Sequence, residues 1–123
     1  MFNKALVTNI LQQIKEASQR VITRFEPITS ANDFTNSTFG VEKLDAICMQ
    51  LITIGESLKN LDKISNKELL VKYPEVDWRG AKGLRDIISH HYFDIDAEQI
   101  YWVCDKNIPQ LHDVIDKMLS DLK

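Results

Sequence analysis

Apolar residues recur along most of the chain in alternating steps of three and four, the spacing that places side chains on one face of an α-helix. The first such stripe predicts a helix from Phe2 to Phe25, and Pro27 ends it because proline is excluded from helix interiors. A second, longer stripe predicts a helix from about Thr38 to Leu61, formed by Leu44, Ile47, Cys48, Leu51, Ile54, Leu58 and Leu61.

Polar segments separate these stripes. Residues 26–40 are rich in Ser, Thr, Asn and Asp, so they predict a surface connection with at most a short helical turn between Ser30 and Asp33. Ser65 followed by Glu68 has the spacing of a capping box and predicts a short helix that continues through Lys72.

The second half of the chain contains two further helical patterns. Asp77 is placed to cap a helix that runs to about His91, and Asp96 is placed to cap another that starts at Ala97 after a turn at residues 93–96. Pro109 lies inside this last pattern, so we expect a kink or a break there.

No segment alternates in the manner of a β-strand, and no hairpin dipeptide such as Asn-Gly occurs. The chain is therefore expected to be all-α, with four principal helices in an antiparallel four-helix bundle, short extra helices, and one domain over residues 1–123.

Composition supports one ordinary soluble domain, with 123 residues, 44% of them hydrophobic and 27% charged. The longest apolar run, Ile100 to Cys104, is far shorter than the roughly 20 residues of a membrane span, so no membrane association is expected. The first 25 residues lack the apolar block of a secretory signal, and a cytoplasmic location follows as the expectation. In that reducing compartment Cys48 and Cys104, both within apolar patterns, are expected to be buried free thiols.

The net charge is −3, from 15 basic and 18 acidic side chains. Such a chain has no global attraction for nucleic acid, so any phosphate-binding site must be a local patch. The histidines and cysteines lack the spacing of metal ligands, and no glycine-rich phosphate loop is present. We therefore expect no metal and no cofactor.

The segment from Trp78 to Tyr92 carries the most informative residues. On an ideal helix Arg85 and His90 border one polar face about 140° apart, whereas His91 falls on the apolar side and is expected to be a packed structural residue. A near-neutral imidazole and a guanidinium are suited to RNA cleavage through the ribose 2′-OH, the first moving protons and the second binding the phosphate. A solvated helix face or an anion-binding surface explains the same spacing.

The same residues resemble the motif region of the HEPN superfamily, in its HepT-like toxin branch. The similarity rests on Arg85, four residues, His90, one residue and Tyr92, and on flanking segments at residues 73–79, 93–96, 44–47, 54–57 and 108–111. It covers nearly the whole chain and is weaker before about Gly40.

This resemblance implies a helical bundle that forms a homodimer around the motif helix and acts as a metal-independent endoribonuclease, with Arg85 and His90 as the catalytic pair. It also implies a nucleotidyltransferase antitoxin that inactivates the toxin by transferring adenylate to Tyr92. For Tyr92, a ring packed at the helix end with its hydroxyl in water is the structural alternative.

Other residues near the motif have two interpretations each. Asp86 either orients Arg85 or His90 or forms a plain ion pair with Lys82, and Glu56 is expected to reach into the cleft beside Gly55, which allows close helix approach. Trp78 and Trp102 are expected to be core or dimer contacts. The alternative to a ribonuclease is a non-catalytic helical module that binds a nucleotide or the partner protein.

Overall fold

The computed structural model describes residues 3–123, and every regular element within that range is helical. The all-α class predicted from the sequence is thus confirmed. Phe2, the predicted start of the first helix, lies outside the described residues. The elements, in chain order, are α1 (Lys4–Phe25), η1 (Ala31–Phe34), α2 (Thr38–Ile64), η2 (Leu70–Lys72), α3 (Trp78–His91), η3 (Tyr92–Asp94), α4 (Ala97–Trp102), η4 (Val103–Asn107) and α5 (Ile108–Asp121).

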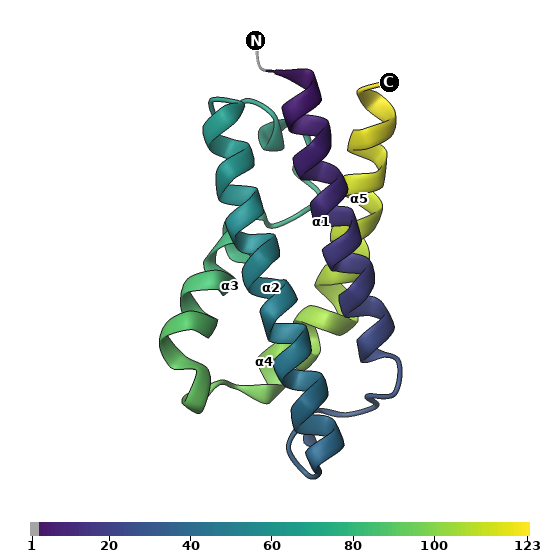
Figure 1. The fold of residues 1–123 in the computed structure, drawn as a ribbon, viewed down its shortest axis with the longest axis vertical. Helices are drawn as coiled ribbons and strands as arrows, with labels where there is room; N and C mark the ends of the chain where they lie inside the picture. Colours follow the sequence, from purple (N-terminus) through teal and green to yellow (C-terminus); the bar gives the residue numbers. More distant parts are fainter. Residues whose placement is uncertain (1–2) are drawn as a thin grey trace.

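The core lies where α1 packs against both α2 and α5 (Figure 1). The predicted stripes supply it: Leu11 and Ile14 from α1, Leu51 from α2 and Ile115 from α5 are all completely buried. Removing such a side chain from water contributes about 1.5–3 kcal/mol, so each of these positions stabilises the fold.

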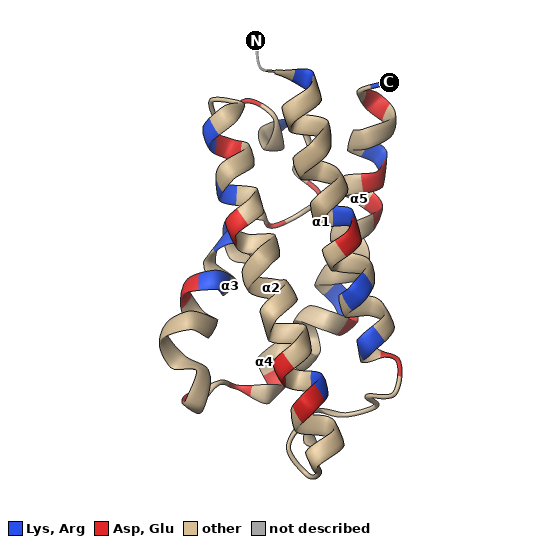
Figure 2. Cartoon of the chain, in the orientation of Figure 1, with Lys and Arg blue, Asp and Glu red and all other residues tan. Residues whose placement is uncertain are grey.

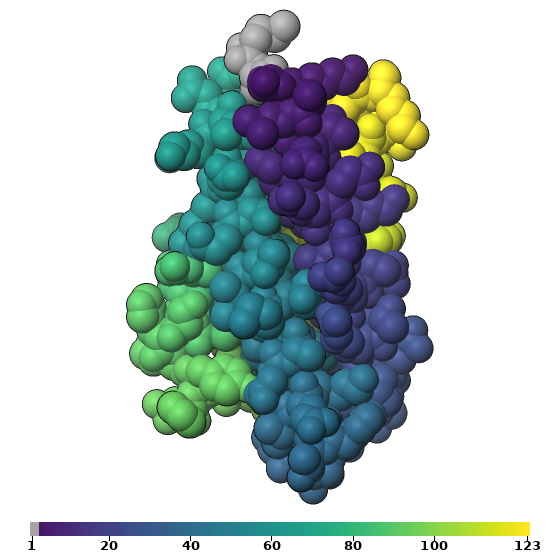
Figure 3. Space-filling model, viewed as in Figure 1, coloured from purple at the N-terminus to yellow at the C-terminus, as the bar shows by residue number. Residues whose placement is uncertain are grey.

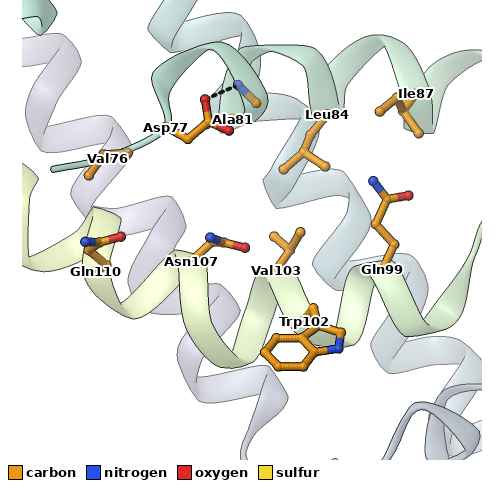
Figure 4. Close-up of a pocket in the computed structure, with 11 residues that line it drawn as sticks. Val76, Asp77, Ala81, Leu84, Ile87, Gln99, Trp102, Val103, Asn107 and Gln110 are labelled. Carbon is orange, nitrogen blue, oxygen red and sulfur yellow. Dashed lines mark hydrogen bonds between the residues drawn. The ribbon is translucent and has the colours of Figure 1, made fainter. Parts of the chain in front are cut away.

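The third long helix, α3, packs chiefly against α2 and buries only Trp78, Leu84 and Ile88. In the space-filling view the green segment of α3 and η3 lies at the margin of α2, outside the α1–α2 face (Figure 3). A groove of about 320 Å³ separates α3 from α4, η4 and α5, with Leu84 and Val103 facing each other across it (Figure 4). Because this groove keeps α3 apart from α4 and α5 along part of its length, the expected four-helix bundle stays a prediction.

The open groove explains one error of the sequence analysis. His91 was expected to be packed on the apolar side of its helix, but it is exposed, because the side of α3 that carries Leu84 and Ile87 borders the groove. Trp78 is a core residue as expected, whereas Trp102 is 60% exposed at the rim of the groove and is no core contact.

Two of the predicted helix caps are confirmed. The side chain of Asp77 accepts a hydrogen bond from the Gly80 N–H at 3.0 Å, and Asp96 accepts from the Glu98 and Gln99 N–H groups. Ser30 and Asp33 do flank a short turn, η1, but Asp33 accepts from Thr29 and Ser30 caps nothing through its side chain.

The predicted cap at Ser65 is wrong. Because Ile64 extends the apolar pattern, α2 continues past Leu61 to Ile64, and Ser65 ends this helix. Asn66 and Lys67 then adopt left-handed backbone conformations, with φ of 58° and 62°, and the Lys67 N–H donates to the Asp62 carbonyl at 2.8 Å. This closure is typical of a Schellman helix end, and only the short turn η2 follows it.

The disturbance expected at Pro109 takes the form of a π-helical segment, η4, which directly precedes it. Ile100, Cys104 and Ile108 are two successive steps of four apart, which would drift by about 80° on an ideal α-helix. The wider turns of η4 absorb this drift, so all three side chains stay buried.

Both cysteines are free and buried, as predicted. Burial raises the pKa of the Cys48 thiol and of the Cys104 thiol to about 12 each, so both stay protonated near neutral pH. Among the helices of residues 3–123, none combines the length and the apolar character that a membrane crossing requires.

Candidate functional site

The Arg85 side chain lies on the side of α3 that contacts α2, where two carboxylates hold it. Its Nε is 2.6 Å from Oε1 of Glu56, on α2, and its Nη1 donates to Oδ1 of Asp86 at 2.9 Å. The hydrogen bond to Asp86 and the charge of Glu56 raise the pKa of the Arg85 guanidinium above its ordinary value. The Arg85 side chain is 37% exposed, so the guanidinium can still be approached from solvent by an oxyanion.

Gly55 sets the position of Arg85. A Cβ atom at Gly55 would lie 2.9 Å from the Arg85 Cβ, closer than real Cβ contacts, and 3.2 Å from the Lys82 carbonyl oxygen, tighter than most of them. The absence of a side chain at this buried position is what lets α3 approach α2, as the sequence analysis expected for Gly55. The same contact brings Glu56 within reach of the guanidinium.

Asp86 bridges Arg85 to a cation that the sequence analysis did not single out. Its Oδ2 is 3.3 Å from Nζ of Lys59, and the hydrogen bonds from Arg85 and Lys59 lower the pKa of its carboxyl. Of the two interpretations of Asp86, the structure shows contact with Arg85, whereas Lys82 pairs with Asp62. Two cations and two carboxylates make this cluster formally neutral.

His90 lies on the outward face of α3 and is exposed. Within residues 3–123 it forms no hydrogen bond or ion pair that would fix its ring. On an ideal helix it is about 7.5 Å along the axis and about 140° around from Arg85. One chain therefore does not bring the two side chains together.

Tyr92 begins η3, at the end of the motif helix, and is 36% exposed. Its ring borders a cavity of about 350 Å³ whose walls include Met49, Ile52 and Ile88. Phe93 contacts it edge-on with ring centroids 6.5 Å apart, and Phe93 itself is fully exposed. The ring thus lies at the helix end with one side open to solvent.

Comparison with known protein families gives this arrangement a context. A profile of the family described as "Ribonuclease HepT-like" matches residues 6–118, a range that contains Glu56, Arg85, His90 and Tyr92. The chain belongs to the HepT-like ribonuclease family.

Curated relatives of the chain align over different shares of their length. "Putative RNase MJ0127" of Methanocaldococcus jannaschii is 30% identical over 122 residues, covering 98% of this chain and 89% of its own. "Putative RNase TTE0752" of Caldanaerobacter subterraneus is 33% identical over 78 residues, covering 63% and 66%. "Probable ribonuclease HepT" of Thermococcus cleftensis is 32% identical over 73 residues, covering 59% and 63%. No solved structure matches the chain significantly.

Residues 3–123 contain no group of three or more His, Cys, Asp or Glu side chains arranged to hold a metal ion. The groups that surround the motif are instead a guanidinium, carboxylates and lysines.

Three lysines at the end of α2 and just after it were not singled out from the sequence. Lys59, Lys63 and Lys67 recur every fourth residue, a spacing typical of one helix face, although only Lys59 and Lys63 lie on α2 and Lys67 lies in the turn that follows it. The spacing of four residues could have identified these lysines from the sequence, but the apolar pattern of the same segment dominated its interpretation.

Proposed function

We propose that the protein is a metal-independent endoribonuclease that cleaves RNA with Arg85 and His90 in a cleft between two copies of the chain. The observation that carries this proposal is the Arg85 guanidinium, fixed by Glu56 at 2.6 Å and Asp86 at 2.9 Å while 37% of the Arg85 side chain stays exposed. A preorganised donor of this kind stabilises the charge that develops on a phosphate.

The proposed reaction is a transfer of the phosphate within the RNA strand. The imidazole of His90 accepts the proton of a ribose 2′-OH, the 2′ oxygen forms a bond to phosphorus, and the bond from phosphorus to the 5′ oxygen breaks. The leaving 5′ oxygen takes up a proton, and the products are a 2′,3′-cyclic phosphate and a 5′-hydroxyl. Arg85 binds the non-bridging oxygens throughout.

A homodimer around α3 removes the obstacle that Arg85 and His90 diverge within one chain. A two-fold axis beside α3 lets Arg85 of one copy face His90 of the other. Met49 is 59% exposed and Phe93 fully exposed next to the motif, and burial of these side chains would stabilise such a pair.

Regulation by a nucleotidyltransferase antitoxin completes the proposal. In this toxin–antitoxin module the Tyr92 hydroxyl attacks the α-phosphorus of ATP, and pyrophosphate leaves. Tyr92 begins η3 directly after the helix that carries Arg85, so a group added to its hydroxyl lies at the end of the motif helix. A phosphate added there competes with RNA for Arg85.

The main test is an RNA cleavage assay in EDTA with three proteins: wild type, Arg85→Ala and His90→Ala. We expect cleavage by the wild type and loss of it in both variants, while cleavage by either variant would contradict the assignment. Mixing the two inactive variants tests the shared cleft. A composite site regains about a quarter of wild-type activity in the mixture, because half of the dimers are mixed and each has one intact site.

Intact mass tests the regulation. Co-expression with the nucleotidyltransferase should add adenylate units to the wild type and none to Tyr92→Phe. Equal mass increases in both proteins would remove Tyr92 from the proposal.

A non-catalytic module that binds a nucleotide or the partner protein is the second candidate. The formal neutrality of the Arg85 cluster favours it, since an already balanced guanidinium attracts RNA weakly. This candidate predicts a stable complex with the nucleotidyltransferase and no RNA turnover by the free protein.

A further inference from the structure

A second charged region lies next to the Arg85 cluster, between the C-terminal half of α2 and the first turns of α3. It is a cavity of about 470 Å³ lined by Lys59, Lys63, Lys67, Arg79 and Lys82, with Asp62 as its one acidic side chain. We call it the basic cavity. Figure 2 shows Lys and Arg positions on both helices in this region. Five cations against one carboxylate stand out in a chain whose net charge is −3.

Most of the local negative charge is already engaged. Asp62, whose side chain is 13% exposed, pairs with Lys82, and Asp86 pairs with Lys59. Lys63, Lys67 and Arg79 have no ion-pair partner within residues 3–123. Three like charges that share one cavity repel each other, so a bound anion stabilises the arrangement.

The backbone at the edge of the basic cavity is held in an unfavourable conformation. Lys67 has φ of 62°, in the left-handed region that residues other than Gly and Asn seldom adopt. The Asp62 carbonyl fixes this turn through the Lys67 N–H, while the Asp62 side chain holds Lys82. One residue thus positions a cation on each side of the cavity.

Gly83 opens the cavity toward the backbone of α3. A Cβ atom there would have no atom of residues 3–123 within 4 Å, so packing within this range does not require a glycine. Glycine inside a helix is less stable than alanine, and the position is thus free for close approach by another molecule.

The position of these cations relative to Arg85 indicates what binds. Arg79, Lys82 and Arg85 lie on one helix within about 9 Å along its axis. The basic cavity has lysine ammonium groups and no aromatic ring, a composition suited to phosphates and unsuited to stacking of bases.

We propose that the basic cavity binds the phosphate backbone of the RNA strand beside the cleavage site, through Lys63, Lys67 and Arg79. This inference rests on the proposed ribonuclease function and supplies the affinity that the neutral Arg85 cluster lacks. Binding at this subsite is independent of base sequence and sensitive to salt.

The test measures binding separately from cleavage. The ligand is a 12-nucleotide RNA methylated at every 2′ oxygen, which cannot be cleaved through the 2′-OH, and binding is followed by fluorescence anisotropy at several salt concentrations. The test variant is Lys63→Gln/Lys67→Gln/Arg79→Gln. The matched control, Arg20→Gln/Lys43→Gln/Lys106→Gln, removes the same charge outside the cavity.

We expect the test variant to bind at least tenfold more weakly than the control. Loss of three phosphate contacts should reduce the slope of log K against log salt by about 2. Equal affinities and equal slopes for the two triple variants, or no RNA binding by the wild type, would overturn the proposal.

Lys67→Gly guards against a folding artefact, because glycine adopts the left-handed conformation without steric cost. We expect weaker RNA binding with no fall in melting temperature, and unchanged binding would remove Lys67 from the subsite. This test distinguishes failure of the subsite from failure of the proposed ribonuclease function. If RNA binding depends on the basic cavity but the protein cleaves no RNA, the subsite is supported and the nuclease function is rejected.

Discussion

The α1–α2–α5 core and the α3 flank are built from helices of similar amphipathic pattern, yet they differ in how much of each helix is buried. The core helices bury continuous apolar stripes, for example Ile47, Leu51 and Leu58 on α2. On α3, Ile88 is buried, but Ile87 is 39% exposed. The exposed side of α3 can therefore present Arg85 and His90 with little loss of core packing, while the core helix α2 contributes Glu56 and Lys59 from its outer face.

The largest expected effect comes from the core itself. Leu51→Ala deletes a completely buried side chain where α2 meets its neighbours, so we expect the free energy of unfolding to fall by about 2–5 kcal/mol. Ile87→Ala, on α3, should cost less than about 1 kcal/mol, because that side chain is already partly in water. Urea denaturation of both variants measures the contrast, and similar losses would show that α3 belongs to the core.

Gly55 of α2 and Gly83 of α3 test the boundary between the regions. Gly55→Ala forces the Arg85 Cβ and the α3 backbone away from α2, and we expect a loss of about 1–3 kcal/mol. Gly83→Ala meets open space and should raise the free energy of unfolding by about 0.5–1 kcal/mol through better helix propensity. Thermal denaturation decides this, and a loss at Gly83 would mean that α3 packs differently.

Glu56→Gln separates positioning from binding at Arg85. The variant keeps the size of the side chain but removes the charge that holds Nε, so we expect kcat for RNA cleavage to fall about tenfold, or about 1.4 kcal/mol. KM should not rise, because a negative charge near the RNA phosphate is also lost. A higher KM with unchanged kcat would place Glu56 in substrate binding instead.

The smallest effect concerns an ion pair on the outside of the core. Lys15 and Asp116 link α1 to α5 at 2.6 Å, and the hydrogen bond from Lys15 lowers the pKa of the Asp116 carboxyl. A lowered folded-state pKa stabilises the fold above the unfolded pKa near 4, and this contribution disappears as the pH falls through the folded value. Asp116→Asn should therefore be slightly less stable than wild type at pH 7 and equally stable near pH 2. A constant difference across this range would exclude the ion pair as its cause.

Much of the fold was readable from sequence because apolar spacing and side-chain caps act locally. Asp77 and Asp96 cap their helices as predicted, since the required N–H groups lie within three residues. Ser65 failed because the same local pattern occurs at a helix end, where the left-handed turn at Asn66 decides the outcome.

The sequence identified most residues of the candidate site, but it did not predict the contacts between them. The contact between Glu56 and Arg85 joins residues 29 positions apart and depends on how α3 packs at Gly55, which no local spacing encodes. The exposure of His91 depends on the groove beside α3, and the pairing of Asp86 with Lys59 depends on the relative rotation of two helices.

The π-helical segment η4 sets the rotation of α5 about its own axis relative to α4. A single-residue deletion within residues 103–107 would leave α4 and α5 helical but turn the whole of α5 by about 100°, which moves its apolar side from α1 into solvent. Sequence length in this short window is therefore more constrained than residue identity.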